Sequence, residues 1–287
     1  MANGFINVLK PPGMTSHDVV SFIRKTYGLK RVGHAGTLDP AAAGVLPVAL
    51  GQATRLIEYT TAADKAYRAE LTLGYATDTG DTTGRIIDQK TVAMPSRSRI
   101  LSALAALTGE IQQVPPMHSA IKIAGKKLYE LARDGITVDR KPRLVHISQL
   151  SLIEAANHTI LFDVTCSKGT YIRTLCSDIG DQLAVPAVMS FLIRTRVGAF
   201  LLADSFSIEE IAENPEAALL AADTALDHIP ELNLSGSQAQ KFCFGQTLSC
   251  PGNDQELVKV YDNTCRFLGL GKLSSNLLVP VKVMSFA

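Results

Sequence analysis

Ten residues near the N-terminus, Arg31 to Pro40, constrain the fold of this chain more than any other segment. They hold two glycines and a proline within a few positions, and such a cluster marks a turn or loop. Before them, Thr15 begins a helix that Gly28 ends, because hydroxyl caps suit helix starts and glycine suits the left-handed stop. After them, an apolar strand is predicted from Val45 to Leu50. The ten residues therefore form a short loop of special geometry between a helix and a strand.

Hydrophobic periodicity predicts the other main elements. The segment Tyr67 to Tyr75 alternates between apolar and polar residues, which is typical of a strand with one face in the core. Further strands are expected at Phe5 to Leu9, Val145 to Leu152, Ile160 to Thr165 and Phe191 to Phe200, and helices at Ser98 to Thr108 and Tyr171 to Leu183. Because helices and strands are mixed along the chain, we expect an α/β protein of the α+β type.

Two changes of pattern divide the chain. At about residues 115–145 a basic segment, with a helix predicted from Lys126 to Arg133, looks like an insertion between core elements. After Pro230 a brief helix and short apolar strands follow, joined by turns that contain Gly and Asn. We therefore expect a large domain at residues 1–230 and a small β-rich domain at residues 231–287.

The net charge of +1 hides an uneven distribution. Residues 1–35 hold five basic side chains and one acidic one, and residues 115–146 hold seven basic and three acidic ones. Residues 204–231 hold eight acidic side chains and no Lys or Arg. A solvated helix face is the simpler explanation of any single run, whereas two basic runs with interleaved aromatic residues favour a polyanionic partner.

Several classes of protein lack their sequence signals. The five cysteines form no C-x-x-C pair, and the six histidines are scattered without metal-ligand spacing. No phosphate-binding P-loop, H-E-x-x-H or G-x-S-x-G pattern occurs. The N-terminus has no signal-peptide pattern, and the apolar run at residues 41–51 is short and contains Pro47. We therefore expect a cytoplasmic protein without a metal, a cofactor or a membrane span.

Asp39 lies between a glycine-containing turn and a proline. Pro40 restricts Asp39 to an extended backbone, while Gly33 and Gly36 allow the preceding turn to fold tightly. The loop would thus present a carboxylate on a stiff backbone. For an isolated Asp-Pro pair, a side chain that caps the next element or closes an Asx-turn is the simpler explanation.

Four segments together carry a family resemblance. In order and spacing, Asn7-Val-Leu-Lys-Pro-Pro-Gly-Met-Thr-Ser16, the stretch from Gly33 to Pro47, Lys65-Ala-Tyr-Arg68 and Cys166-Ser-Lys-Gly-Thr-Tyr-Ile-Arg-Thr-Leu175 resemble the TruB family of tRNA pseudouridine synthases. The resemblance covers residues 4 to about 200. It implies isomerisation of the uridine numbered 55 in the T-loop of tRNA without a cofactor. We expect the protein to be a monomer.

The resemblance also implies an architecture. The central sheet would be mixed and mainly antiparallel, and the basic insertion would be a thumb that grips the T-stem-loop, with Lys126 and Lys127 among the RNA-binding residues. The C-terminal domain would be PUA-like and bind RNA. That last part depends on position and β-rich pattern, because no sharp motif supports it.

Three residues are implied to carry the chemistry. Asp39 matches the catalytic aspartate, which acts as a nucleophile, and the sequence leaves open whether it attacks the base or the sugar. A nucleophile in a pocket that excludes water needs a nearby cation, and Arg173 matches it; an exposed helix charge is the alternative. Tyr67 matches the tyrosine that stacks on the base and is a candidate to remove the C5 proton, although a core position beside Leu71 also explains it.

Other residues are implied to bind the substrate. A uridine in a folded T-loop is stacked, so the enzyme must flip it out, and His34 matches the residue that fills the gap. Tyr171 and Leu192 would line the pocket, with core packing as the alternative for both. Lys10 and Pro11 match a motif below the active loop, where a solvated strand end and a strand terminator are the alternatives.

Two other functions remain to be weighed. A non-catalytic tRNA-binding or RNA-folding module would need the basic segments but not Asp39, so the intact set of Asp39, Tyr67 and Arg173 argues against it. Transfer or hydrolysis through an aspartyl intermediate on a small molecule would leave the basic insertion idle, and no phosphate loop accompanies Asp39.

Overall fold

The computed structural model describes residues 2–119, 121–123 and 125–284. It divides into two compact units. The first unit consists of Met1–Ala62 and Arg196–Ala287, and the second of Ala63–Thr195. The second unit is therefore inserted into the sequence of the first. The predicted domain boundary at residue 230 stays a prediction.

The N-terminal part of the first unit is a strand-helix-loop-strand arrangement. Strand β1 (Gly4–Lys10) is antiparallel to β3 (Ala43–Leu50), and the short β2 (Val32–His34) also pairs with β3. Helix α1 (Ser16–Tyr27) has the predicted ends: Thr15 forms a capping box with Asp18, and Gly28 adopts a left-handed conformation at φ 62°. The apolar stripe of α1 belongs to the same hydrophobic cluster as the buried side chains of β1 and β3.

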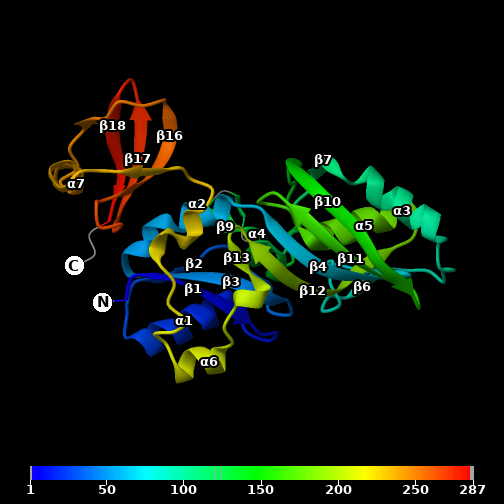
Figure 1. Ribbon diagram of the computed structural model, residues 1–287. Helices are drawn as coiled ribbons and strands as arrows, with labels where there is room; N and C mark the ends of the chain where they lie inside the picture. Colours follow the sequence, from blue (N-terminus) through cyan, green and yellow to red (C-terminus); the bar gives the residue numbers. More distant parts are fainter. Residues whose placement is uncertain (1, 120, 124, 285–287) are drawn as a thin grey trace. The chain divides into compact units, whose positions relative to one another are not determined.

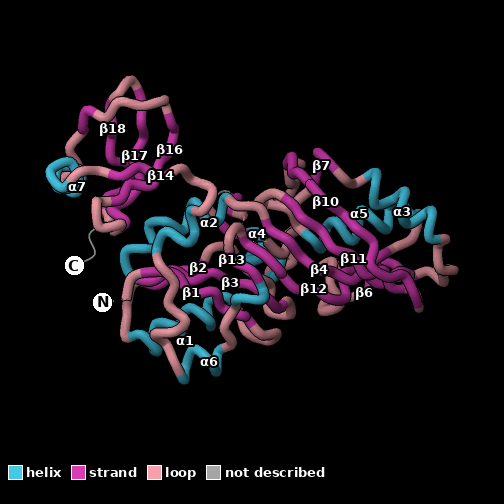
Figure 2. The backbone as a smooth tube through the Cα atoms, viewed as in Figure 1, coloured by secondary structure: helices cyan, strands magenta, loops and turns pink. Residues whose placement is uncertain are grey.

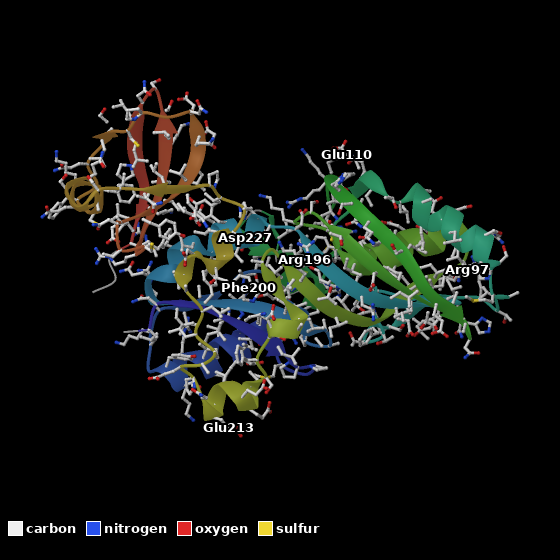
Figure 3. The ribbon with its side chains drawn as sticks, viewed as in Figure 1. Arg97, Glu110, Arg196, Phe200, Glu213 and Asp227 are labelled. Atoms are coloured by element: carbon white, nitrogen blue, oxygen red, sulfur yellow. The ribbon has the colours of Figure 1, made fainter. Side chains whose placement is uncertain are left out.

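The acidic segment follows β12 (Ala187–Val197) and β13 (Phe200–Leu201), which form a hairpin. It contains the 3₁₀ turns η2 (Leu202–Asp204) and η3 (Ala222–Leu226) and the helix α6 (Ile208–Glu213). Its backbone bonds to β1 at two places: Phe5 exchanges hydrogen bonds with Leu220, and Phe206 donates to Asn7 and accepts from Leu9. Figure 3 labels Glu213 at the end of α6 and Asp227 just after η3.

The C-terminal residues form a five-stranded sheet with the order β14-β16-β17-β18-β15, orange to red in Figure 1. Its elements are β14 (Glu231–Asn233), α7 (Gly236–Cys243), β15 (Leu248–Ser249), β16 (Gln255–Tyr261), β17 (Phe267–Ser274) and β18 (Leu277–Val283). This sheet shares a core with the rest of the first unit, because Tyr261 and Phe267 lie in one cluster with Leu56 of η1 (Gly51–Leu56). Two polar contacts join the same parts: the Tyr261 hydroxyl donates to Asp223 at 2.6 Å, and Lys282 pairs with Glu58 of α2 (Ile57–Ala62) at 2.9 Å.

The second unit is a sheet with the order β12-β4-β11-β10-β7. Its strands are β4 (Lys65–Leu73), β7 (Gly109–Gln113), β10 (Arg143–Ala156) and β11 (Thr159–Cys166), besides β12. The pairs β4–β11, β11–β10 and β10–β7 are antiparallel. Helices α3 (Arg97–Ala106) and α5 (Ile172–Leu183) pack on each other along this sheet, as Figure 2 shows. Figure 3 labels the first residue of α3, Arg97, and Glu110 of β7.

Two hairpins extend from this sheet. One joins β5 (Tyr75–Thr77) to β6 (Ile86–Gln89) through the glycine-containing turn, and the other joins β8 (Lys122–Ile123) to β9 (Lys126–Lys127). Helix α4 (Leu128–Arg133) begins directly after β9, so the helix predicted from Lys126 starts two residues later. The sequence also predicts a strand from Ala120 to Ile123; β8 covers its last two residues, and Ala120 lies outside the described residues. With the mixed sheet and the β-rich C-terminal part, the predicted fold class is confirmed.

Candidate active site

The loop that carries Asp39 is fastened to the start of α1. The buried Ser16 hydroxyl donates to the Leu38 carbonyl at 3.2 Å and accepts from the Leu38 N–H at 2.9 Å. On the other side, the N–H of Ala42 donates to the Asp39 carbonyl at 3.1 Å, and the N–H of Gly13 donates to the Pro40 carbonyl at 2.8 Å. The backbone on both sides of Asp39 is therefore fixed, while its side chain is only half-buried.

Lys10, the last residue of β1, supports the same loop through hydrogen bonds. It is 0% exposed, and its ammonium donates to the carbonyls of Pro11 at 2.9 Å, Met14 at 2.7 Å and Pro40 at 3.3 Å. The alternative of a solvated strand end is therefore wrong for Lys10. A buried charge of this kind is tolerated because hydrogen bonds compensate its lost hydration. The contacts tie the Asp39 loop to the end of β1, and Pro11 contributes through its carbonyl.

His34 lies at the end of β2 and is half-buried. Its ring meets the ring of His17 in α1 edge-on, with centroids 5.7 Å apart and an interplanar angle of 77°. The role of His34 in filling the place of a flipped base stays a prediction.

In the second unit, Arg173 lies in the first turn of α5 and is 7% exposed. One guanidinium nitrogen donates to the Thr79 carbonyl at 3.0 Å, and the other donates to the His118 carbonyl at 2.7 Å. The alternative interpretation of Arg173 as an exposed charge on a helix is therefore wrong. The turn that contains Thr79 approaches closely, since a Cβ on Gly80, whose φ is 75°, would lie 3.4 Å from the Arg173 Cβ.

Gln113, at the end of β7, holds the residue that precedes α5. Its side-chain oxygen accepts from the Tyr171 N–H at 3.0 Å, and its amide nitrogen donates to the Tyr171 carbonyl and to Asp178, both at 3.4 Å. Burial raises the pKa of Asp178 to about 6, and the hydrogen bond from Gln113 opposes this shift. Tyr171 is half-buried, which is compatible both with a residue that lines a pocket and with a residue that packs in the core.

Tyr67 lies on the buried face of β4 with Lys65 and Ala69 and is 8% exposed. The guanidinium of Arg194, which is 1% exposed, donates a hydrogen bond to the Tyr67 hydroxyl. Leu192 is buried two residues earlier on the same strand. Arg194 and Gln113 are further candidate residues that no sequence motif indicates. No signal for Arg194 existed in the alternation of β12, because Ser190 and Arg196 lie on the same face and make that face appear polar.

Lys126 and Lys127 lie on the β8–β9 hairpin. Lys126 is exposed, whereas the Lys127 ammonium donates to the Tyr129 hydroxyl at 3.1 Å and lies 5.2 Å from the centre of its ring. The Arg133 guanidinium lies 5.4 Å from the same ring. The cations and the aromatic ring thus form a cluster on the hairpin and α4, of a composition suited to RNA phosphates and bases.

The predicted site residues fall into two groups. Lys10, Pro11, His34 and Asp39 belong to the first unit, and Tyr67, Lys126, Lys127, Tyr171, Arg173 and Leu192 belong to the second. Within the first unit, the structure brings Lys10 and Pro11 to the Asp39 loop. Among the described residues, no group of three or more His, Cys, Asp or Glu side chains could hold a metal ion. In the same part of the chain, no helix is long and apolar enough to cross a membrane.

Comparisons with known proteins define the class of this fold and site. The family model "TruB family pseudouridylate synthase (N terminal domain)" matches residues 24–172, and two models of TruB C-terminal domains match residues 173–229 and 230–284. A crystal structure of a Cbf5-Nop10-Gar1 complex contains a similar chain, with a TM-score of 0.77 and 28% identity over 98% of this chain and 84% of that one.

Curated relatives agree with this class. The chain is 47% identical to the tRNA pseudouridine synthase B of Caldanaerobacter subterraneus subsp. tengcongensis over 98% of this chain and 99% of the relative. It is 49% identical to the protein of the same name from Symbiobacterium thermophilum, over 85% of this chain and 82% of that relative. The chain belongs to the TruB family of pseudouridylate synthases.

Proposed function

We propose that this chain converts the uridine numbered 55 in the T-loop of tRNA to pseudouridine, with Asp39 as the nucleophile. The observation that carries the proposal is the half-buried Asp39 carboxylate on a loop fixed at both ends, in a chain of the TruB family. The names of the curated relatives support tRNA as the substrate. We expect the enzyme to act as a monomer in the cytoplasm.

The reaction is an isomerisation that consumes nothing. The C1′–N1 glycosidic bond breaks, the uracil turns, a C1′–C5 bond forms, and the proton on C5 leaves while one is gained at N1. The Asp39 carboxylate forms a transient covalent bond to the base or the sugar, and that bond breaks before the product is released. Because no electrons or groups are exchanged with another molecule, the reaction consumes no co-reactant, and we expect it to run without a cofactor or a metal.

The other residues prepare the nucleophile and the base. Arg173 supplies the cation that keeps the carboxylate ionised. Its two hydrogen bonds to backbone carbonyls fix the orientation of the guanidinium. Tyr67 stacks on the flipped base and accepts the C5 proton, while Tyr171 and Leu192 line the pocket. His34 occupies the place that the flipped base leaves in the T-loop.

The basic residues of the thumb grip the RNA. Lys126 and Lys127 contact phosphates of the T-stem-loop, and the PUA-like C-terminal domain adds contacts on the acceptor side. The number of phosphates neutralised by Lys and Arg sets the salt dependence of such binding. Affinity and chemistry therefore depend on different residues.

The test uses a tRNA transcript labelled with tritium at C5 of uridine and no added cofactor. We expect the native enzyme to release tritium, and sequencing of the product to place pseudouridine at position 55. Asp39→Asn and Asp39→Ala should both abolish release while tRNA affinity, measured by fluorescence anisotropy, stays within about threefold. Asp227→Asn, which changes an exposed carboxyl of the acidic segment, is the matched control and should remain active.

Two results would contradict the proposal. Substantial release by both Asp39 variants would remove Asp39 as the nucleophile. Tight tRNA binding by the native protein without any pseudouridine would favour the non-catalytic tRNA-binding module.

A further inference from the structure

Arg194 is a large charged side chain in the interior of the second unit. It is 1% exposed and lies on the buried face of β12 with Leu192. Removing a guanidinium from water costs several kcal/mol unless hydrogen bonds and charges compensate it. Packing alone therefore does not explain why β12 keeps a charge at this buried position.

The contact between Arg194 and Tyr67 supplies such a reason. The Tyr67 hydroxyl oxygen accepts a hydrogen bond from the guanidinium. Burial lowers the pKa of Arg194, whereas the bond and the charge interaction with Tyr67 raise it, so the two groups stabilise each other. A second contact joins the same strands, since the Ser190 hydroxyl donates to Glu70 at 2.7 Å.

The direction of the bond matters for chemistry. A guanidinium has no acceptor atom, so the Tyr67 O–H proton cannot point at Arg194 and must point elsewhere. A fixed positive charge at a phenol oxygen also favours the phenolate over the phenol. The second effect suits a tyrosine that takes a proton, because such a residue must present a negative oxygen to the substrate.

We propose that Arg194 is a positioning residue that fixes the Tyr67 oxygen and favours its ionised form for removal of the C5 proton. The inference rests on the proposed function, in which Tyr67 faces the target base. Tyr67 first loses its phenolic proton to water. Its oxygen then takes the C5 proton, and the C5–H electron pair returns to the ring of the base.

Other titratable groups of the second unit interact electrostatically with the surroundings of Tyr67 and Arg194. Lys65 neighbours Tyr67 on the buried face of β4, and burial followed by repulsion from Arg194 lowers its pKa to about 8. Cys166, Asp64 and Lys168 also interact with Lys65 electrostatically. Since Lys65 loses charge near pH 8, Arg194 is the cation that remains constant as the pH rises through the working range of a phenolate.

The first experiment reads the Tyr67 oxygen directly, without RNA. 3-Fluorotyrosine is placed at position 67, and ¹⁹F NMR follows its ionisation in the native protein, in Arg194→Lys and in Arg194→Met. We expect the midpoint to rise by about one pH unit or more in Arg194→Met and by less in Arg194→Lys, because lysine keeps the charge. Arg196→Met changes a half-buried arginine two residues farther along β12 and should leave the midpoint unchanged.

The second experiment measures the chemistry. Single-turnover tritium release at saturating tRNA should slow by about ten- to a hundredfold in Arg194→Met near pH 7 and recover as the pH rises. tRNA affinity should stay within about threefold. In a Tyr67→Phe background, Arg194→Met should cause no further loss, because the two residues act through one oxygen.

The outcomes separate this inference from the proposed function. An NMR midpoint that does not move in Arg194→Met, in protein that circular dichroism shows to be folded, would overturn it. If Arg194→Met does not fold, Arg194→Lys takes its place in the Tyr67→Phe background. An unchanged midpoint in Arg194→Lys, together with a loss of tritium release that is fully additive to that of Tyr67→Phe, would then overturn the inference. A shifted midpoint in an enzyme that makes no pseudouridine would instead count against the proposed function alone.

Discussion

The two groups of candidate residues are held in different ways. The Asp39 loop is fastened by partners close in sequence, since Lys10 and Ser16 reach Pro40 and Leu38 across 30 and 22 residues. Arg173 is held by carbonyls 94 and 55 residues away, in the turn at Thr79 and at His118. The loop is thus a nearly local structure, whereas the arginine site requires most of the second unit. We expect a substitution that removes a support of the Asp39 loop to destabilise the protein strongly. A substitution that removes one support of the arginine site should destabilise it less, because several weaker contacts share that role.

The largest expected effect on stability comes from Lys10→Met. The change removes a buried ammonium that donates to three backbone carbonyls and should lower the free energy of unfolding by about 3 kcal/mol. Urea titration followed by circular dichroism measures this. Lys25→Met, in an exposed position of α1, should change it by less than about 0.5 kcal/mol. Equal midpoints for the two variants would show that Lys10 does not support the loop.

The next effect concerns RNA binding by the thumb. The double change Lys126→Glu with Lys127→Glu should weaken tRNA binding by about tenfold or more. It should also flatten the slope of log K against log salt by about 1.4 to 1.8, because two phosphate contacts are lost. Lys90→Glu with Arg97→Glu changes the net charge equally at two exposed positions outside the thumb and is the control. If affinity and slope are the same in both pairs, the thumb is an ordinary solvated hairpin and helix.

A smaller effect is expected at the arginine site. Gln113→Ala removes the acceptor of the Tyr171 N–H and should lower the free energy of unfolding by about 1 to 2 kcal/mol. Gln112→Ala, on the exposed face of the same strand, is the matched control. A loss of unfolding free energy as large as that of Lys10→Met would contradict the expected difference between the two regions. One hydrogen-bonding side chain at the arginine site would then stabilise the protein as much as the three hydrogen bonds of Lys10.

The smallest effect depends on pH. The pKa of Asp178 is about 6 in the folded protein and about 3.9 in an unfolded chain. The folded state therefore binds more protons between pH 4 and pH 6, and this group's contribution to stability falls as the pH rises through that window. Asp178→Asn should stabilise the protein by about 1 kcal/mol at pH 8 and hardly at all at pH 4, allowing for partial exposure to solvent.

Thermal unfolding at both pH values tests this, with Asp139→Asn at an exposed position as the control. An equal gain for Asp178→Asn at pH 4 and pH 8 would mean that the substitution improves packing and that charge is not involved.

Local physical chemistry allowed much of this protein to be read from its sequence. The capping box at Thr15, the left-handed Gly28 and the alternation of β4 depend on neighbouring residues, so their patterns are visible in the chain. The family resemblance in the same segments identified the class of enzyme, and the family comparison confirms it.

Tertiary structure decided the rest. That Lys10 is buried, that Arg173 bonds to Thr79 and His118, and that Arg194 bonds to Tyr67 depend on which distant segments the sheet brings together. The start of α4 at Leu128 depends likewise on the pairing of β8 with β9, which takes Lys126 and Lys127 into a hairpin. The sequence determines a charge or a turn by itself, whereas burial and the partner of a buried charge exist only once remote strands are paired.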